Sequence, residues 1–167
     1  MNRNYVEEIA DRIDESETPF DENRFKTLTK VGSALTTWSL SNSEYAIAFQ
    51  LAQVGSHVKA TLDDGGKSGK GFDAWVDGVP SEFKETKPGP NAVHDNMRKS
   101  NGKGAVRTYI RMPDDYSAKT AMASLDDYLR TRSSDFQEYH IWAAGDPTGW
   151  SISGTIGGGY KCKGHGC

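Results

Sequence analysis

The chain lacks a long apolar run, carries few cysteines and has little net charge. No stretch of 18 apolar residues occurs in its 167 residues, so we expect no membrane-spanning helix. The two cysteines, Cys162 and Cys167, stand together at one end and do not indicate a redox compartment. The formal charge of -3 does not by itself indicate nucleic-acid binding. The first residues contain no apolar signal core, so we expect no secretion signal of the chain's own.

The content of apolar and aromatic residues predicts a folded protein. Apolar residues make up 35% and aromatic residues 10% of the chain, enough for one domain with a core. The order of the expected elements predicts a single α/β (α+β) domain, with a central mixed β-sheet flanked by helices. We divide it into an N-terminal helical segment (1–40), an α/β core (41–156) and a tail rich in glycine and cysteine (157–167).

Hydrophobic periodicity indicates where these elements lie. In the acidic first segment, Tyr5, Ile9 and Ile13 predict a short amphipathic helix, which either faces water or docks on a basic groove. The remaining expected elements are helices over 42–54, 91–100 and 114–131, and strands over 57–62, 105–112, 139–144 and 150–156.

A hairpin over residues 72–87 contains the most informative cluster of charged residues. Asp77-Gly78 is a turn dipeptide between two strand-like runs. Because side chains alternate along a strand, Glu82 and Lys84 share one face and Phe83 points to the other. The hairpin can therefore gather Asp73, Glu82 and Lys84 on one side of a sheet.

This cluster suits metal-assisted phosphodiester hydrolysis. Asp73 and Glu82 are candidate ligands of Mg²⁺, a hard cation that prefers oxygen ligands. Such a cation polarises a phosphate and lowers the pKa of a bound water. Lys84 beside them is a candidate for orienting that water or for stabilising charge on the phosphate.

The spacing from Asp73 to Glu82-Phe83-Lys84 resembles the Asp…Glu-x-Lys signature of PD-(D/E)xK nucleases. The wider range 44–150 resembles the C-terminal toxin domains of contact-dependent growth-inhibition and other polymorphic bacterial toxins, many of which are tRNA-cleaving nucleases. The resembling pieces are E-Y-A-I-A-F-Q-L-A-Q-V-G-S-H-V, D-A-W-V-D-G-V-P-S-E-F-K, N-A-V-H-D-N-M-R-K-S-N-G-K-G-A-V-R-T-Y-I and Y-H-I-W-A-A-G-D.

This resemblance implies a PD-(D/E)xK nuclease-like fold and cleavage of RNA, most often tRNA. It implies a third acid from the helix before the hairpin, for which Glu44 is the candidate; a glutamate that favours the helix dipole is the structural alternative. It also implies the C-terminal module of a secreted bacterial toxin that acts in the target-cell cytoplasm, and a cognate immunity protein in the producing cell. We expect the chain to be a monomer.

Local charge supports a nucleic-acid substrate. Between Lys84 and Arg111, seven cations face two acids, which is the pattern expected of a groove that tracks phosphates. The glycine-rich stretch 63–71 adds two lysines. The candidate contacts are Lys67, Lys70, Lys87, Arg98, Lys99, Lys103 and Arg107.

Three alternatives remain open from sequence. In a metal-independent RNase, Lys84 and His94 would assist attack by the 2′-hydroxyl group of the RNA. DNA is a second candidate substrate, because phosphate contacts do not identify the sugar. A non-catalytic protein-interaction domain is a third reading of the same charge pattern.

The tail contains three soft ligands, Cys162, His165 and Cys167. A structural zinc site needs four ligands, and the C-x₂-C spacing is missing. A disulfide between the two cysteines is a further option, and we expect a disordered tail.

Overall fold

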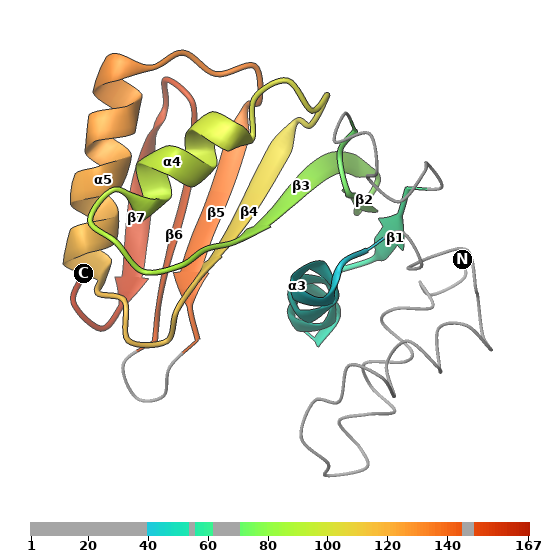
Figure 1. Ribbon diagram of the computed structural model, residues 1–167, viewed down its shortest axis with the longest axis horizontal. Coiled ribbons are helices and arrows are strands. Elements are labelled where there is room, and N and C mark those ends of the chain that lie inside the picture. Colours follow the sequence, from blue (N-terminus) through green and yellow to red (C-terminus); the bar gives the residue numbers. More distant parts are fainter. Residues whose placement is uncertain (1–39, 54–55, 62–70, 145–148) are drawn as a thin grey trace, which may run out of the picture. The chain divides into compact units, whose positions relative to one another are not determined.

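The computed structural model describes residues 40–53, 56–61, 71–144 and 149–167. They fall into two compact units: unit 1 contains the described residues up to Ser81, and unit 2 contains those from Glu82 to Cys167. Helices and strands are both present, so the fold class is α+β, as predicted (Figure 1). None of the helices in the described ranges is long and apolar enough to cross a membrane. The expected N-terminal helix, Lys67 and Lys70 lie outside the described residues.

Unit 1 contains a helix followed by short antiparallel strands. Helix α3 (Asn42–Gln53) precedes strands β1 (Val58–Ala60) and β2 (Ala74–Val76), and the first residues of β3 (Val79–Glu85) complete the unit. Strand β1 pairs with β2, and β2 pairs with β3. Helix α3 matches the predicted helix closely, and its buried apolar residues are Tyr45, Ile47, Ala48, Phe49 and Ala52.

The turn between β2 and β3 confirms the predicted hairpin. Asp77 and Gly78 have φ values of 50° and 80°, the left-handed conformation that a two-residue hairpin turn requires at both positions. Asp77 Oδ1 also accepts a hydrogen bond of 2.8 Å from the His57 backbone N–H. Ala74 is buried while its neighbour Trp75 is 40% exposed, so the side chains alternate across β2 as expected.

Unit 2 is a mixed sheet with two helices. After the end of β3 come helix α4 (Ala92–Lys99), strand β4 (Arg107–Met112), helix α5 (Ala118–Thr131), and strands β5 (Glu138–Ala143), β6 (Trp150–Thr155) and β7 (Gly159–Gly164). The strands are hydrogen-bonded in chain order from β3 to β7. Strands β4 and β5 are parallel and are joined through α5, whereas β5, β6 and β7 are antiparallel.

Helices α4 and α5 cover one face of the unit 2 sheet (Figure 1). Alternate residues of each strand point to that face and pack against apolar residues of the two helices. The fully buried members of this core are Val93, Met97, Ile110, Ala121, Leu125, Tyr128, Tyr139, Ile141 and Ile152.

Helix α5 begins four residues later than predicted. We expected it to begin at Asp114, but it begins at Ala118. The Ser117 hydroxyl accepts a hydrogen bond of 3.1 Å from the Thr120 backbone N–H and caps the helix. Before the cap, the Tyr116 N–H donates to the Pro113 carbonyl oxygen at 2.9 Å and closes a turn.

The tail is ordered, so the expectation of a disordered tail is wrong. Residues 159–164 form β7 and pair with β6, which places Cys162 opposite Ile152 and Tyr160 opposite Gly154. Tyr160 and Cys162 pack against the core, and a disulfide joins Cys162 to Cys167. In this glycine-rich segment, the contacts of alternate residues with the core are enough to stabilise a strand.

The Tyr139 hydroxyl is an unsatisfied polar group in this core. Its ring lies over Gly154, where an added Cβ would come within 2.5 Å of Tyr139 Oη. The hydroxyl is buried without a hydrogen-bond partner among the described residues, and burial raises the pKa of Tyr139 to about 12. The fold therefore places this oxygen at an energetic cost.

Removing this hydroxyl should not destabilise the protein. We expect Tyr139→Phe to leave the free energy of unfolding unchanged or to raise it by about 1 kcal/mol, because no hydrogen bond is lost. Tyr128→Phe is the matched control: the Tyr128 hydroxyl contacts Ser134 Oγ at 2.6 Å and Asn101 Nδ2 at 3.0 Å, so its loss should cost about 1 kcal/mol. Urea unfolding of both variants measures the difference; a larger loss for Tyr139→Phe would contradict it.

Candidate functional site

In unit 1, Glu44 is held by a capping box at the start of α3. Its Oε1 atom accepts a hydrogen bond of 3.0 Å from the Ser41 backbone N–H, and the Ser41 hydroxyl accepts one of 3.4 Å from the Glu44 N–H. This reciprocal pair satisfies two amide groups that the helix start would otherwise leave unpaired. Glu44 therefore stabilises the start of α3 as a capping residue, a contact that the sequence analysis did not predict.

Glu44 also interacts with Asp73, which immediately precedes β2. The backbone of Asp73 is fixed by pairing: its N–H donates to the Ser81 carbonyl oxygen at 2.9 Å, and its own carbonyl oxygen accepts from the Thr61 N–H at 3.1 Å. Burial, then the charge of Asp73 and a hydrogen bond to its carboxyl group, raise the pKa of Glu44 to about 7. The two acids are thus held together closely enough to share a proton.

In unit 2, Glu82 and Lys84 form an ion pair on β3. Glu82 Oε2 lies 3.0 Å from Lys84 Nζ, and the side chains are 2% and 22% exposed. The other carboxylate oxygen, Oε1, is buried and has no hydrogen-bond partner in the described part of the chain. Phe83 between them points to the opposite face, where its ring contacts Tyr109 with 5.9 Å between centroids. The predicted sharing of one face by Glu82 and Lys84 is confirmed.

The donor set fits a hard cation. A buried carboxylate oxygen with no partner, as at Glu82, is a group that an added cation would satisfy. The negative charge of Asp73, which together with burial raises the pKa of Glu44, marks a second place where a cation would relieve repulsion. Within the described ranges, no group of three or more His, Cys, Asp or Glu side chains is arranged to hold a metal.

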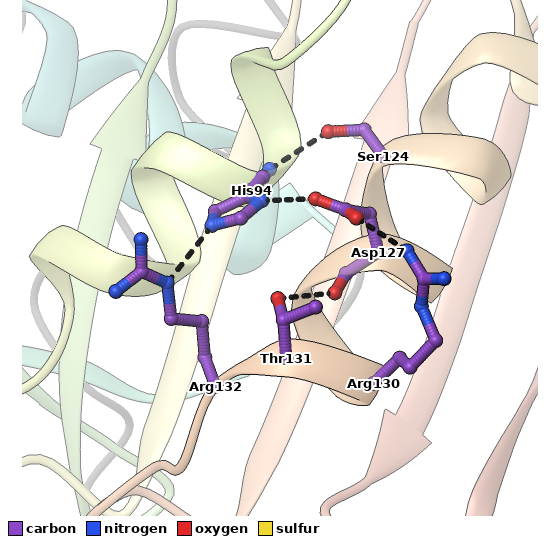
Figure 2. A network of polar contacts seen from close by, with 6 residues as sticks. All are labelled: His94, Ser124, Asp127, Arg130, Thr131 and Arg132. Carbon is purple, nitrogen blue, oxygen red and sulfur yellow. Dashed lines mark hydrogen bonds and ion pairs between the residues drawn. The ribbon is translucent and has the colours of Figure 1, made fainter.

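His94 belongs to a polar network between α4 and α5 (Figure 2). Its Nδ1 atom lies 2.6 Å from Asp127 Oδ2, and its backbone N–H donates to Ser124 Oγ at 2.9 Å. Arg132 Nε–H donates to His94 Nε2 at 3.3 Å, which places the ring proton on Nδ1. The hydrogen bond to His94, followed by that to Arg130, lowers the pKa of Asp127.

Both ring nitrogens of His94 are thus occupied, and its side chain is 15% exposed. The contacts give the residue a structural role in joining the two helices. Sequence reasoning did not find Asp127, because 33 residues separate it from His94 and no spacing relates residues on two different helices.

The basic residues of the stretch 84–111, which include five of the predicted nucleic-acid contacts, lie on both sides of the unit 2 sheet. Arg98 and Lys99 are exposed on α4, whereas Arg107 and Arg111 point away from the helices on β4. Arg107 pairs with Glu138 at 3.0 Å and Arg111 with Glu85 at 3.4 Å, so nearby acids offset both charges. Lys103 follows α4, and Lys87 follows β3.

Two of these predicted contacts, Lys87 and Lys99, line the same cleft. This cleft, of about 590 Å³, lies between the loop after β3 and one face of α4. Its lining also includes the amide side chains of Asn91 and Asn96, which the sequence analysis did not single out. Their positions on the cleft side of α4 follow from helical spacing only once the packing of α4 is known.

On the sheet face opposite the helices, His140 stacks on Tyr109 with 5.0 Å between ring centroids. Burial, and then the positive charge of Arg107, lower the pKa of His140 below its ordinary value of 6.5. An unfolded chain therefore takes up a proton at a higher pH than the folded chain does. The contribution of His140 to the free energy of unfolding is fully present at high pH, and it declines as the pH falls below about 6.5.

We expect His140→Gln to reduce the loss of unfolding free energy between about pH 7 and pH 5. Urea unfolding midpoints of the wild type and the variant at the two pH values test this. His165→Gln, which changes an exposed histidine in the tail, is the control and should keep the wild-type slope. An unchanged slope in His140→Gln would exclude this residue as the source.

Comparison with known proteins found no relative of this chain: no protein-family model, no curated protein and no solved structure matches it.

Proposed function

We propose that the chain is a nuclease that hydrolyses phosphodiester bonds in RNA, with tRNA as the substrate that the toxin resemblance implies. One observation carries the proposal. Glu82 is a buried carboxylate with one oxygen 3.0 Å from Lys84 and the other without a partner among the described residues. A buried carboxylate oxygen without a partner is costly, and an unsatisfied group of this kind is explained if a bound ion or a reacting group satisfies it.

In this proposal, Asp73 and Glu82 are the Mg²⁺ ligands that the sequence pattern predicts, and Glu44 is the third acid that the resemblance implies. When bound, the cation supplies positive charge that polarises the phosphate and favours ionisation of a water molecule. Lys84 donates hydrogen bonds to that water or to a phosphate oxygen, and its ion pair with Glu82 orients its ammonium group.

The resemblance further supports a biological setting as a toxin module, delivered to a competing bacterium and neutralised in the producer by an immunity protein. Positive charge on α4 supports an acidic surface on that partner, since Arg98 and Lys99 are exposed there. Co-purification of the chain with an acidic protein encoded beside it would test this assignment.

The test of the function is incubation of the purified chain with total tRNA and with duplex DNA, in Mg²⁺ and in EDTA. Discrete tRNA fragments that appear only with Mg²⁺ are the expected result. Cleavage of DNA instead of RNA would correct the substrate. Cleavage in EDTA that is lost in His94→Gln would transfer the role of acid or base to His94. No cleavage under any condition would overturn the proposal and favour a protein-interaction domain.

A further inference from the structure

The cleft beside α4 is continuous along the chain with the Glu82–Lys84 pair. Its lining begins at Glu85, the residue after Lys84, and follows the loop to Pro90. The opposite wall is one face of α4 and the residue before it: Asn91 precedes the helix, and Asp95 and Lys99 follow on α4 at intervals of four residues. The volume of about 590 Å³ lies in the range of small-molecule sites.

The loop wall of the cleft is held in place before any ligand binds. Pro88 and Pro90 restrict the backbone on either side of Gly89. The Gly89 carbonyl oxygen accepts hydrogen bonds from the Tyr116 hydroxyl at 2.7 Å and from the Ala92 N–H at 3.3 Å. A wall fixed in this way loses little conformational entropy on binding.

The charges around the cleft favour an anion. Lys87 and Lys99 are both exposed at its lining. Of the two acids there, Glu85 is paired with Arg111 at 3.4 Å, which leaves Asp95 as the acid with no cation in contact among the described residues. Two lysines against one such acid make the cleft suitable for a phosphate group.

Asn96 adds a directional polar group to the same cleft. Its side chain belongs to a residue that is 8% exposed, and Nδ2–H donates to the Ala92 carbonyl oxygen at 2.8 Å. That bond orients the amide, and Asn96 is one of the residues that line the cleft. An amide oxygen at the wall of a cleft can accept a hydrogen bond from a ligand that carries a donor, and so favours such a ligand.

We propose that this cleft binds one nucleotide of the substrate, next to the bond that is cut, and prefers a base with an exocyclic amino group. Lys87 and Lys99 contact the phosphate, and Asn96 Oδ1 accepts from the amino group. Cytosine carries such a donor at the position where uracil carries an acceptor, so these two bases differ in the group that Asn96 reads. The inference rests on the proposed function, since it identifies a subsite for the same substrate.

The test is a titration of the full chain with CMP and with UMP in EDTA. Changes in the amide chemical shifts of NMR spectra report the binding. We expect CMP to bind roughly two- to ten-fold more tightly than UMP, the effect of one hydrogen bond. Asn96→Leu should abolish this preference. Lys99→Ala should weaken the binding of both nucleotides by about two- to five-fold. Lys119→Ala is the matched control, because Lys119 is also an exposed lysine on a helix and does not line the cleft.

Equal binding of CMP and UMP by the wild type would overturn the base preference, even if Asn96→Leu fails to fold. No shift of cleft residues with either nucleotide would overturn the site. The nuclease proposal is judged separately, since it is decided by cleavage of polynucleotide. Cleavage without mononucleotide binding would overturn only the proposed nucleotide site in the cleft. Binding without cleavage would overturn only the nuclease proposal.

Discussion

Glu82→Gln is expected to reduce RNA cleavage by at least about 100-fold while the protein stays folded. The substitution keeps the size of the side chain and an oxygen that can accept from Lys84, but it removes the buried negative charge. Lys84→Ala should cause a loss of similar size, because it removes the group proposed to stabilise charge on the phosphate. Initial rates of tRNA cleavage at saturating Mg²⁺ measure both effects.

Glu138→Gln is the matched control for this prediction. Glu138 is also a strand glutamate that contacts a cation at 3.0 Å, in this case Arg107, but it is 37% exposed and has no proposed role in cleavage. We expect its rate to stay within about two-fold of the wild type. Far-ultraviolet circular dichroism and the unfolding midpoint of each variant show whether the fold is intact. Full activity in a folded Glu82→Gln would rule out Glu82 as part of the reaction.

A double variant tests whether the carboxylates of unit 1 act in the same reaction. If Glu44 and Glu82 serve one site, Glu44→Gln combined with Glu82→Gln should be little slower than Glu82→Gln alone, because residues that act as a unit are not additive. Losses that multiply would indicate independent roles. Since Glu44 also caps α3, its variant needs the same check of folding.

Leu125→Ala is expected to have the largest effect on stability, a loss of about 2–5 kcal/mol in the free energy of unfolding. Leu125 on α5 is fully buried in the core of unit 2, where it packs with apolar residues of the helices and strands. Its truncation removes apolar contacts and leaves a cavity that the surrounding strands cannot fill without moving. Urea unfolding measures the loss.

Leu129, one turn later on the same helix, supplies the control. It is only partly buried against the same core, so Leu129→Ala should cost clearly less than Leu125→Ala. Both substitutions have the same chemistry and the same change in helix propensity. The difference between them therefore reports burial alone, and equal losses would show that the core is not centred on Leu125.

Much of the fold could be predicted because local rules determine it. The dipeptide Asp77-Gly78 requires the turn conformation seen in the hairpin, and alternation along β3 places Glu82 and Lys84 on one face. Helix α3 ends within one residue of the predicted end, at Gln53. In each case the interaction joins residues that are close in the chain, so spacing alone is informative.

Other features depended on contacts between distant segments. The tail became strand β7 because Tyr160 and Cys162 reach the core, although its glycines alone indicated disorder. His94 contacts Asp127 because helices α4 and α5 pack together. The excess of cations between residues 84 and 111 was visible in the sequence, but acids far along the chain, such as Glu138, offset part of it.

The sequence by itself therefore determined the helices, the hairpin and the alternation that pairs Glu82 with Lys84, since each follows from periods of two or 3.6 residues. Only the tertiary structure decided which carboxylate oxygen of Glu82 is left without a partner and which cations line the cleft beside α4. Burial and charge compensation depend on the packing of whole elements, and no local pattern records which elements will meet.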